Sequence, residues 1–294
     1  MLDPSAVKKQ VVKSLSAARW RARADLDRLD RGAERWAYER AARADAERFA
    51  EVERFCLFVG FPRCGGSLTG AMLDAHPDMV IAHELGALRK VGIGYSRAAL
   101  FAATMRADRQ FAARGFVNQD DVFEIPGQWQ GRVRRLRVIG DKNAGDSSLR
   151  LLDDPTLIDR LQTTVGVPVR VIVVVRHPSD NIARIARRGP LSVLTAAARY
   201  DDIARVVGTV LDAAGDGALV VHHEDTVADP RASLRRMAAF LDVDAPDDWL
   251  DACAELVLPS PRLARDAVEW SPAERMVVAE IIGRYDFLRR YVVG

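Results

Sequence analysis

The sequence predicts an α/β fold, a three-layer sandwich in which a central, mainly parallel sheet carries helices on both faces. Short apolar runs alternate with longer stretches of helical periodicity, which is the pattern of parallel strands joined by helices. A glycine-rich turn follows the first apolar run. The run Val167–Val175 is β-branched almost throughout, as expected for a strand that is buried on both faces.

Composition narrows the class of protein. Of 294 residues, 49% are hydrophobic and 29% charged, and 43 Lys and Arg against 41 Asp and Glu leave a net charge of +2. This near balance argues against an overall electrostatic attraction of the protein to nucleic acid or to a membrane surface. Three scattered cysteines argue against a disulfide framework. We see no secretory signal and no apolar run of bilayer length, so we expect a cytoplasmic location.

The N-terminal region, residues 4–53, is rich in Ala, Arg, Glu and Asp and has almost no helix breakers. Larger apolar residues recur at steps of three and four: Trp20, Leu26, Leu29, Ala33 and Trp36. This spacing predicts an amphipathic helix or helical pair. We expect residues 1–53 to form a helical extension packed on one domain of residues 54–294. A homodimer contact, or a lid over an acceptor site, is the alternative role.

The remaining elements follow from local patterns. Strands are predicted at Phe55–Val59, Met79–Ala82, Leu136–Gly140, Val167–Val175 and Ala218–His222. Residues 86–135 read as mostly helix and loop. Helices are predicted from Leu68 to Leu73, from Pro178 to about Arg188, over Ser192–Ala214, from Asp229-Pro230 to about Leu241, and over Pro272–Tyr291. Pro178 suits the first position of a helix because proline has no N–H to lose there.

The glycine-rich turn is Gly60-Phe-Pro-Arg-Cys-Gly-Gly-Ser67. Between a strand and a helix, such a turn places free backbone N–H groups and a positive helix end around one point, which is how a phosphate is held. Its spacing is that of a P-loop, so the predicted sandwich is of the nucleotide-kinase-like type. Gly66 stands where the P-loop lysine should be, and Arg63 supplies a cation inside the loop. The loop is therefore poorly suited to ATP or GTP hydrolysis.

Polar residues end all five predicted strands. The carboxyl ends of parallel strands meet at one edge of the sheet, where ligands bind. The groups at these ends are Arg63 with the loop, His83 and Glu84, Asp141 and Lys142, Arg176, and His222, His223 and Glu224. Their joint placement predicts a site that combines cations, a carboxylate and imidazoles.

From about Phe55 to Leu241 the chain resembles the sulfotransferases that use 3′-phosphoadenosine-5′-phosphosulfate (PAPS). Three motifs carry the resemblance: Pro62-Arg-Cys-Gly-Gly-Ser67, Arg176-His-Pro178, and His223-Glu-Asp225 followed by Asp229-Pro230. In the family the first holds the 5′-phosphosulfate and the second binds the 3′-phosphate. The resemblance thus implies PAPS as donor co-substrate, adenosine-3′,5′-bisphosphate (PAP) as product, and no metal.

Within that family the chain is most similar to the tyrosylprotein sulfotransferases and their bacterial relatives. Leu73-Asp-Ala-His-Pro-Asp78 followed by His83-Glu84 resembles the stretch that leads to their catalytic glutamate, and Asp141-Lys142 resembles their lysine segment. The resemblance implies that Glu84 is the general base, and that Arg63 and Lys142 are catalytic cations. In-line sulfonate transfer needs such a base for the acceptor proton and fixed positive charge for the leaving oxygen.

The resemblance also implies a set of donor-binding residues: Arg63, Cys64, Gly65, Gly66, Ser67, Leu68, Arg176, Arg184, His223 and Arg262. Two positions depart from the family pattern. Gly66 replaces a threonine, and Arg184 stands where a hydroxyl residue usually binds the 3′-phosphate. Arginine binds phosphate well, so Arg184 can serve, or Ser179 can contribute instead.

Other interpretations stay open. A P-loop kinase acting on a small molecule or nucleotide is one, and a catalytically silent protein that binds an adenosine nucleotide is another. Cys64 in an anion-binding loop could be a nucleophile, and His83 could be the base in place of Glu84. The acceptor stays unidentified: a hydroxyl or amine on a small molecule, carbohydrate, lipid or peptide.

Overall fold

The computed structural model describes residues 33–118, 121–188, 191–257 and 263–292. Five strands form one sheet: β1 (Arg54–Phe58), β2 (Met79–His83), β5 (Val138–Lys142), β6 (Val169–Val175) and β7 (Ala218–His222). Their order is β2-β5-β1-β6-β7 and every pairing is parallel. The α/β prediction is confirmed.

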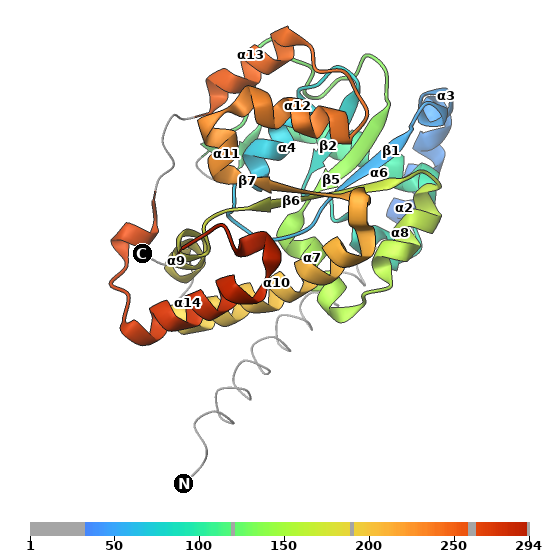
Figure 1. The fold of residues 1–294 in the computed structure, drawn as a ribbon. Helices are drawn as coiled ribbons and strands as arrows, with labels where there is room; N and C mark the ends of the chain where they lie inside the picture. The colour runs from blue at the N-terminus through green and yellow to red at the C-terminus, as the bar shows by residue number, and fades with distance from the viewer. Residues whose placement is uncertain (1–32, 119–120, 189–190, 258–262, 293–294) are drawn as a thin grey trace.

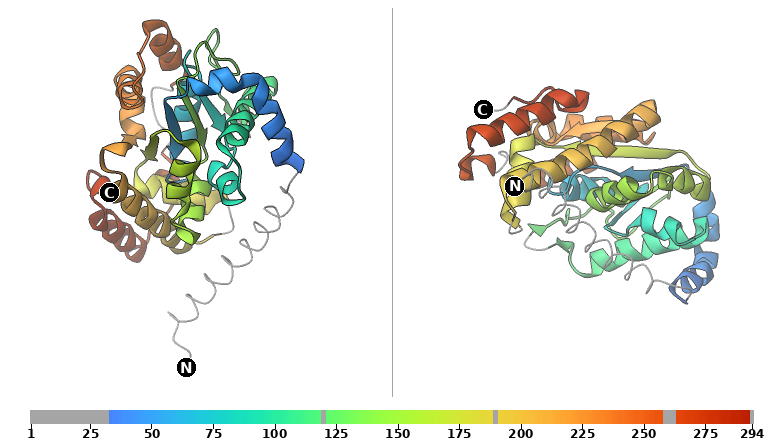
Figure 2. Two further views of the ribbon diagram at one scale, coloured as in Figure 1. Left: turned by 90° about the vertical axis from the view of Figure 1, so that its right-hand side faces the viewer. Right: turned by 90° about the horizontal axis from the view of Figure 1, so that it is seen from below.

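Helices cover both faces of this sheet (Figures 1 and 2). On one side lie α4 (Gly66–Asp74), α11 (His223–Ala228), α12 (Pro230–Phe240) and α13 (Asp247–Leu256). On the other lie α7 (Ala144–Asp153), α8 (Leu157–Val165) and α10 (Val193–Ala214). Because the central strands are covered on both faces, Phe55 to Phe58 of β1 are completely buried. No helix in the described ranges is both long and apolar enough to cross a bilayer.

Several predicted boundaries hold and two need correction. Helix α9 (Pro178–Arg188) is as predicted, and α10 begins directly after its N-cap, Ser192. Asp141 and Lys142 do not follow β5 but belong to it, because they pair with Leu57 of β1 and His83 of β2. The last helix, α14 (Pro272–Arg284), ends well before Tyr291, because the backbone turns extended at Tyr285.

The region 86–135 contains helices α5 (Ala87–Gly92) and α6 (Arg97–Ala113). A short antiparallel pair follows, β3 (Val117–Asn118) with β4 (Asp121–Val122). Near the C-terminus, α14 is followed by a short 3-10 turn, Asp286–Leu288.

The described part of the N-terminal extension is helical. It consists of α2 (Ala33–Ala42), a 3-10 turn (Arg43–Asp45) and α3 (Ala46–Ala50), and α2 packs along α6. Tyr38 and Ala42 form the buried face of α2. Trp36, which we expected on that face, is 63% exposed because two residues turn a helix by about 200°. The predicted stripe residues Trp20, Leu26 and Leu29 lie outside the described residues.

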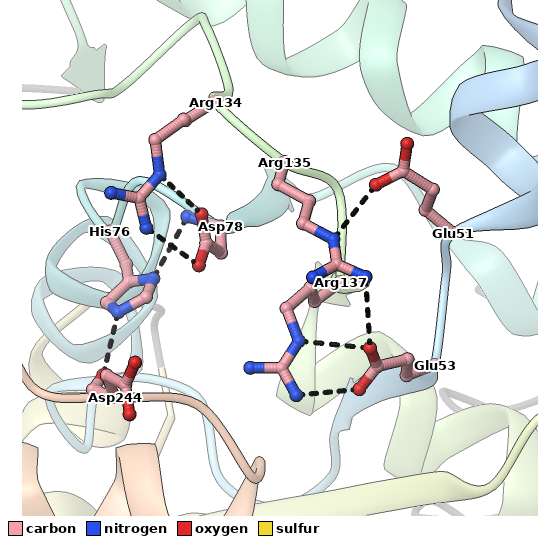
Figure 3. Close-up of polar contacts among 8 residues, drawn as sticks. All are labelled: Glu51, Glu53, His76, Asp78, Arg134, Arg135, Arg137 and Asp244. Atoms are coloured by element: carbon pink, nitrogen blue, oxygen red, sulfur yellow. Dashed lines mark hydrogen bonds and ion pairs between the residues drawn. The ribbon is translucent and has the colours of Figure 1, made fainter.

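Ion pairs close the edge of the sheet at which the strands begin (Figure 3). The pairs are Arg134 with Asp78, Arg135 with Glu51, and Arg137 with Glu53. Beside them, the two ring nitrogens of His76 contact the Asp78 amide and the Asp244 carbonyl. The arginine-rich segment before β5 is therefore paired with carboxylates. These ion pairs hold that segment to the residues that lie just before β1 and β2.

Candidate active site

A cavity of about 450 Å³ lies at the opposite edge, at the carboxyl ends of the strands. The cavity opens beside β1, where the chain switches from building one half of the sheet to building the other, which is the usual ligand position in such folds. The predicted residues that line it are Arg63, Gly65, Gly66, Ser67, Leu68, Glu84, Lys142, Arg176, Arg184 and His223. Folding thus brings residues from five strand ends into one volume.

The glycine-rich loop is held by the helices around it. Gly60 has a φ of +134° and is bracketed by the hydroxyl of Ser148, which accepts from its N–H (2.8 Å) and donates to its carbonyl (3.0 Å). Asn181 donates its side-chain amide to the carbonyl of Pro62 (2.9 Å). Arg63 and Gly65 also have positive φ. These contacts hold the shape of the loop, and its last two residues, Gly66 and Ser67, are the first two of α4.

Cys64 lies within the loop but faces away from the cavity. Its thiol is turned into the core, donates to the carbonyl of Phe61 (2.9 Å) and does not line the cavity. Burial raises the pKa of the Cys64 thiol to about 11. A neutral, buried thiol is a poor nucleophile, so the geometry does not support covalent chemistry at Cys64.

Lys142 supplies the ammonium group that Gly66 leaves out of the loop. Its Nζ lies 3.1 Å from Ser67 Oγ, 3.1 Å from Glu84 Oε1 and 3.4 Å from His83 Nε2. The side chain is only 5% exposed, and this burial lowers the pKa of Lys142. The cation reaches the start of α4 from a neighbouring strand, a position that no sequence spacing within the loop reveals.

Glu84 follows β2 directly and faces the cavity. Burial acts to raise the pKa of its carboxyl, but the charge of Lys142 and its hydrogen bond outweigh this, so the pKa is lowered. His83 beside it stacks on Phe111 at 4.3 Å and accepts a hydrogen bond from Asn118 (2.9 Å). Burial, reinforced by Lys142, lowers the pKa of His83 to about 4. At neutral pH the site thus holds a charged carboxylate beside a neutral imidazole.

Asp141 sets the turn that presents Glu84. Its buried carboxylate accepts hydrogen bonds from the backbone N–H groups of Leu85 (2.9 Å), Gly86 (2.9 Å) and Ala87 (2.7 Å). Glu84 and Gly86 both have positive φ, which a turn this tight requires. Asp141 was expected at the strand end, but its role as the cap of α5 was not predicted, because it depends on which loop the fold places opposite it.

Two arginines also line the cavity. Arg176 is buried and donates from Nε (3.1 Å) and Nη2 (3.0 Å) to Asp180. Arg184 lines the cavity two turns further along α9, whereas Ser179 is buried and does not line it. Arg262, expected to close over the nucleotide, lies outside the described residues.

His223 closes the cavity against the loop. Its ring packs so tightly on Gly65 that a Cβ at that glycine would lie 2.5 Å from Nδ1. Burial, followed by the charge of Arg176, lowers the pKa of His223 to about 4. The ring is therefore neutral at pH 7. It packs against the loop at Gly65, and the positive charge nearby comes from Arg176.

The sequence interpretation missed several residues that line the cavity. Asn118, Asp121 and Phe123 line it from the β3–β4 pair and the segment after it. Two-residue strands leave almost no periodic signal, so sequence alone could place them only in a region of helix and loop, residues 86–135.

Comparison with known proteins identifies the fold. No protein-family model and no curated protein sequence matches the chain. Among solved structures, the sulfotransferase domain from the curacin biosynthetic pathway is similar, with a TM-score of 0.52, 15% identity and coverage of 83% of this chain and 99% of that domain. The sulfotransferase domain of the Synechococcus PCC 7002 olefin synthase has a TM-score of 0.50, 20% identity and coverage of 80% and 96%. The fold of this chain is therefore that of the sulfotransferases.

Proposed function

We propose that this protein is a PAPS-dependent sulfotransferase that moves a sulfonate group to a hydroxyl or amine of a small-molecule, carbohydrate or peptide acceptor. One observation carries the proposal. A carboxylate, an ammonium group and a hydroxyl meet at the start of α4, where Lys142 Nζ lies 3.1 Å from both Glu84 and Ser67. The same cavity is also lined by Arg176 and Arg184.

The cavity suits a donor that carries phosphate groups at two positions of its ribose, 5′ and 3′. Its volume lies within the range of small-molecule and cofactor sites. The glycine-rich loop and the start of α4 would hold the phosphosulfate group, because the first N–H groups of a helix have no partner within the helix and carry its positive end. Arg176 and Arg184 would hold the 3′-phosphate, since guanidinium groups match phosphate oxygens.

The roles of the residues follow from their charges. PAPS supplies an activated sulfonate whose leaving group is a phosphate. Glu84, ionised because of Lys142, would take the proton of the acceptor. Lys142 and Arg63 would stabilise negative charge on the sulfonate and on the departing oxygen. Asp141 would keep Glu84 in place, because its carboxylate accepts hydrogen bonds from the three backbone N–H groups that follow Glu84.

Calorimetric binding of PAP, with ADP and ATP as controls, tests the proposal. We expect PAP to bind the wild type tightly and Arg176→Ala at least tenfold more weakly, with weak binding of ATP in both. Binding of ATP with magnesium in preference to PAP would contradict the proposal and favour a kinase. PAP binding without sulfonate transfer to any acceptor would favour a silent nucleotide-binding protein.

A further inference from the structure

Gly70 and Lys142 lie so close together that no residue with a Cβ would fit at position 70 without a shift. Gly70 lies in the second turn of α4 and is buried. A Cβ added there would lie 2.6 Å from Cγ and 2.9 Å from Cβ of Lys142. Both separations are shorter than real Cβ contacts. The stem of Lys142 therefore crosses α4 over a position at which only hydrogen fits.

A change of rotamer would move Lys142 Cγ but could not relieve the contact with Cβ. The position of Lys142 Cβ is set by β5, whose backbone is paired with β2 at His83 and, through Asp141, with β1 at Leu57. The far end of the side chain is equally fixed by its contacts with Ser67 and Glu84. A methyl group at position 70 would therefore have to move either α4 away from the sheet or the lysine away from its partners.

The backbone gives no other reason for glycine at this position. Gly70 is helical and is not among the glycines with positive φ. Glycine inside a helix is unfavourable by about 1 kcal/mol relative to alanine. Gly283 in α14 offers a contrast, because a Cβ there would meet nothing within 4 Å.

We propose that Gly70 is a positioning residue: its missing side chain is the groove through which Lys142 reaches the start of α4. This inference rests on the proposed function for its catalytic consequence. Donor binding and sulfonate transfer would then depend on different residues. The glycine-rich loop and Arg176 would bind the donor, whereas Gly70 acts only through Lys142. Loss of the groove should thus impair sulfonate transfer more than donor binding.

The first test is a double-mutant cycle of thermal stability. We expect Gly70→Ala to lower the Tm by about 3–10 °C through overpacking. Lys142→Gly removes both atoms that the new methyl group would meet, so Gly70→Ala should cost much less in that background. Gly283→Ala is the matched control and should leave the Tm unchanged or slightly raised. The proposal is overturned if Gly70→Ala is as harmless as the control, or equally harmful in both backgrounds.

The second test separates positioning from general damage. PAPS turnover is measured with the best acceptor from a panel of phenols, sugars and tyrosine peptides, and PAP binding is measured by calorimetry. We expect Gly70→Ala to lower kcat by about 10- to 100-fold, while the Kd for PAP changes less than threefold. A parallel loss of PAP affinity would contradict the positioning role. If the wild type itself does not bind PAP, the proposed function fails, and the stability cycle still decides whether Gly70 accommodates Lys142.

Discussion

Asp180 holds Arg176 in place with one oxygen and the C-terminal segment with the other. Its Oδ2 accepts from Nε and Nη2 of Arg176 at 3.1 and 3.0 Å, and its Oδ1 accepts from the backbone N–H of Arg265 at 2.9 Å. Both side chains of the ion pair are almost fully buried, 5% and 1% exposed. The guanidinium group is thus oriented before a ligand arrives, which reduces what binding must order.

Replacing Asp180 by Asn should therefore weaken PAP binding. An amide cannot match the charge of Arg176, and breaking a buried pair leaves an uncompensated cation that is free to move. We expect a loss of about 1–3 kcal/mol, or roughly 5- to 150-fold in Kd by calorimetry. Asp202→Asn, which removes an exposed ion pair with Arg205, should have no effect. Equal affinities in wild type and Asp180→Asn would show that the pair is only structural.

Glu84→Gln should abolish most of the activity without loss of donor binding. The amide is isosteric with the carboxylate but cannot accept the acceptor proton. We expect kcat to fall by about 10²- to 10⁴-fold, measured as PAPS turnover, while PAP affinity stays within a few fold. Glu53→Gln, at the far edge of the sheet, is the charge-matched control. Full activity of Glu84→Gln would show that another residue is the general base, and His83 would be tested first.

The cysteines should resist alkylation in the folded protein. All three, Cys56, Cys64 and Cys253, are buried, and burial raises the pKa of Cys64 to about 11. Iodoacetamide at pH 8 should label none of them within an hour by mass spectrometry, and all three after unfolding in guanidinium chloride. Rapid labelling of Cys64 in the native protein would revive its interpretation as a nucleophile. Cys64→Ser should retain activity.

A buried carboxyl pair should make stability depend on pH. Asp74 accepts from the N–H of Ile81 (2.8 Å) and Asp108 from that of Gly131 (3.2 Å), and both side chains are almost completely buried. Burial raises the pKa of Asp74 above its usual value and that of Asp108 to about 6. The folded state therefore keeps protons that the unfolded state releases, so this contribution to stability falls as pH rises from about 4 to about 6.

Asp108→Asn removes one of these titrating groups and provides the measurement. We expect the free energy of unfolding of the wild type, relative to Asp108→Asn, to increase by on the order of 2 kcal/mol between pH 7 and pH 4.5. Urea unfolding at several pH values gives this difference directly. A difference that is constant across the range, or that changes in the opposite direction, would show that Asp108 is ionised in the folded protein at low pH.

Local patterns in the sequence determined most of the architecture. Runs such as Val169–Val175 are long and β-branched enough to specify a buried strand, and Pro178 and Ser192 mark where α9 and α10 begin. The glycine-rich loop specified its own turn. Because parallel strands bring their carboxyl ends to one edge, the sequence also predicted many of the residues that line the cavity. It did not predict the inward turn of Cys64 or the lining residues from the β3–β4 pair.

Only the tertiary structure decided how those residues act on one another. No spacing in the chain shows that Lys142 fills the place left by Gly66, that Gly70 makes room for it, or that Asp141 caps the turn at Glu84. The hydrogen bonds among these contacts join residues that are 54 to 75 positions apart. They depend on strand order, register and the packing of α4 on the sheet, and these are set by burial of the whole core rather than by any local run of residues.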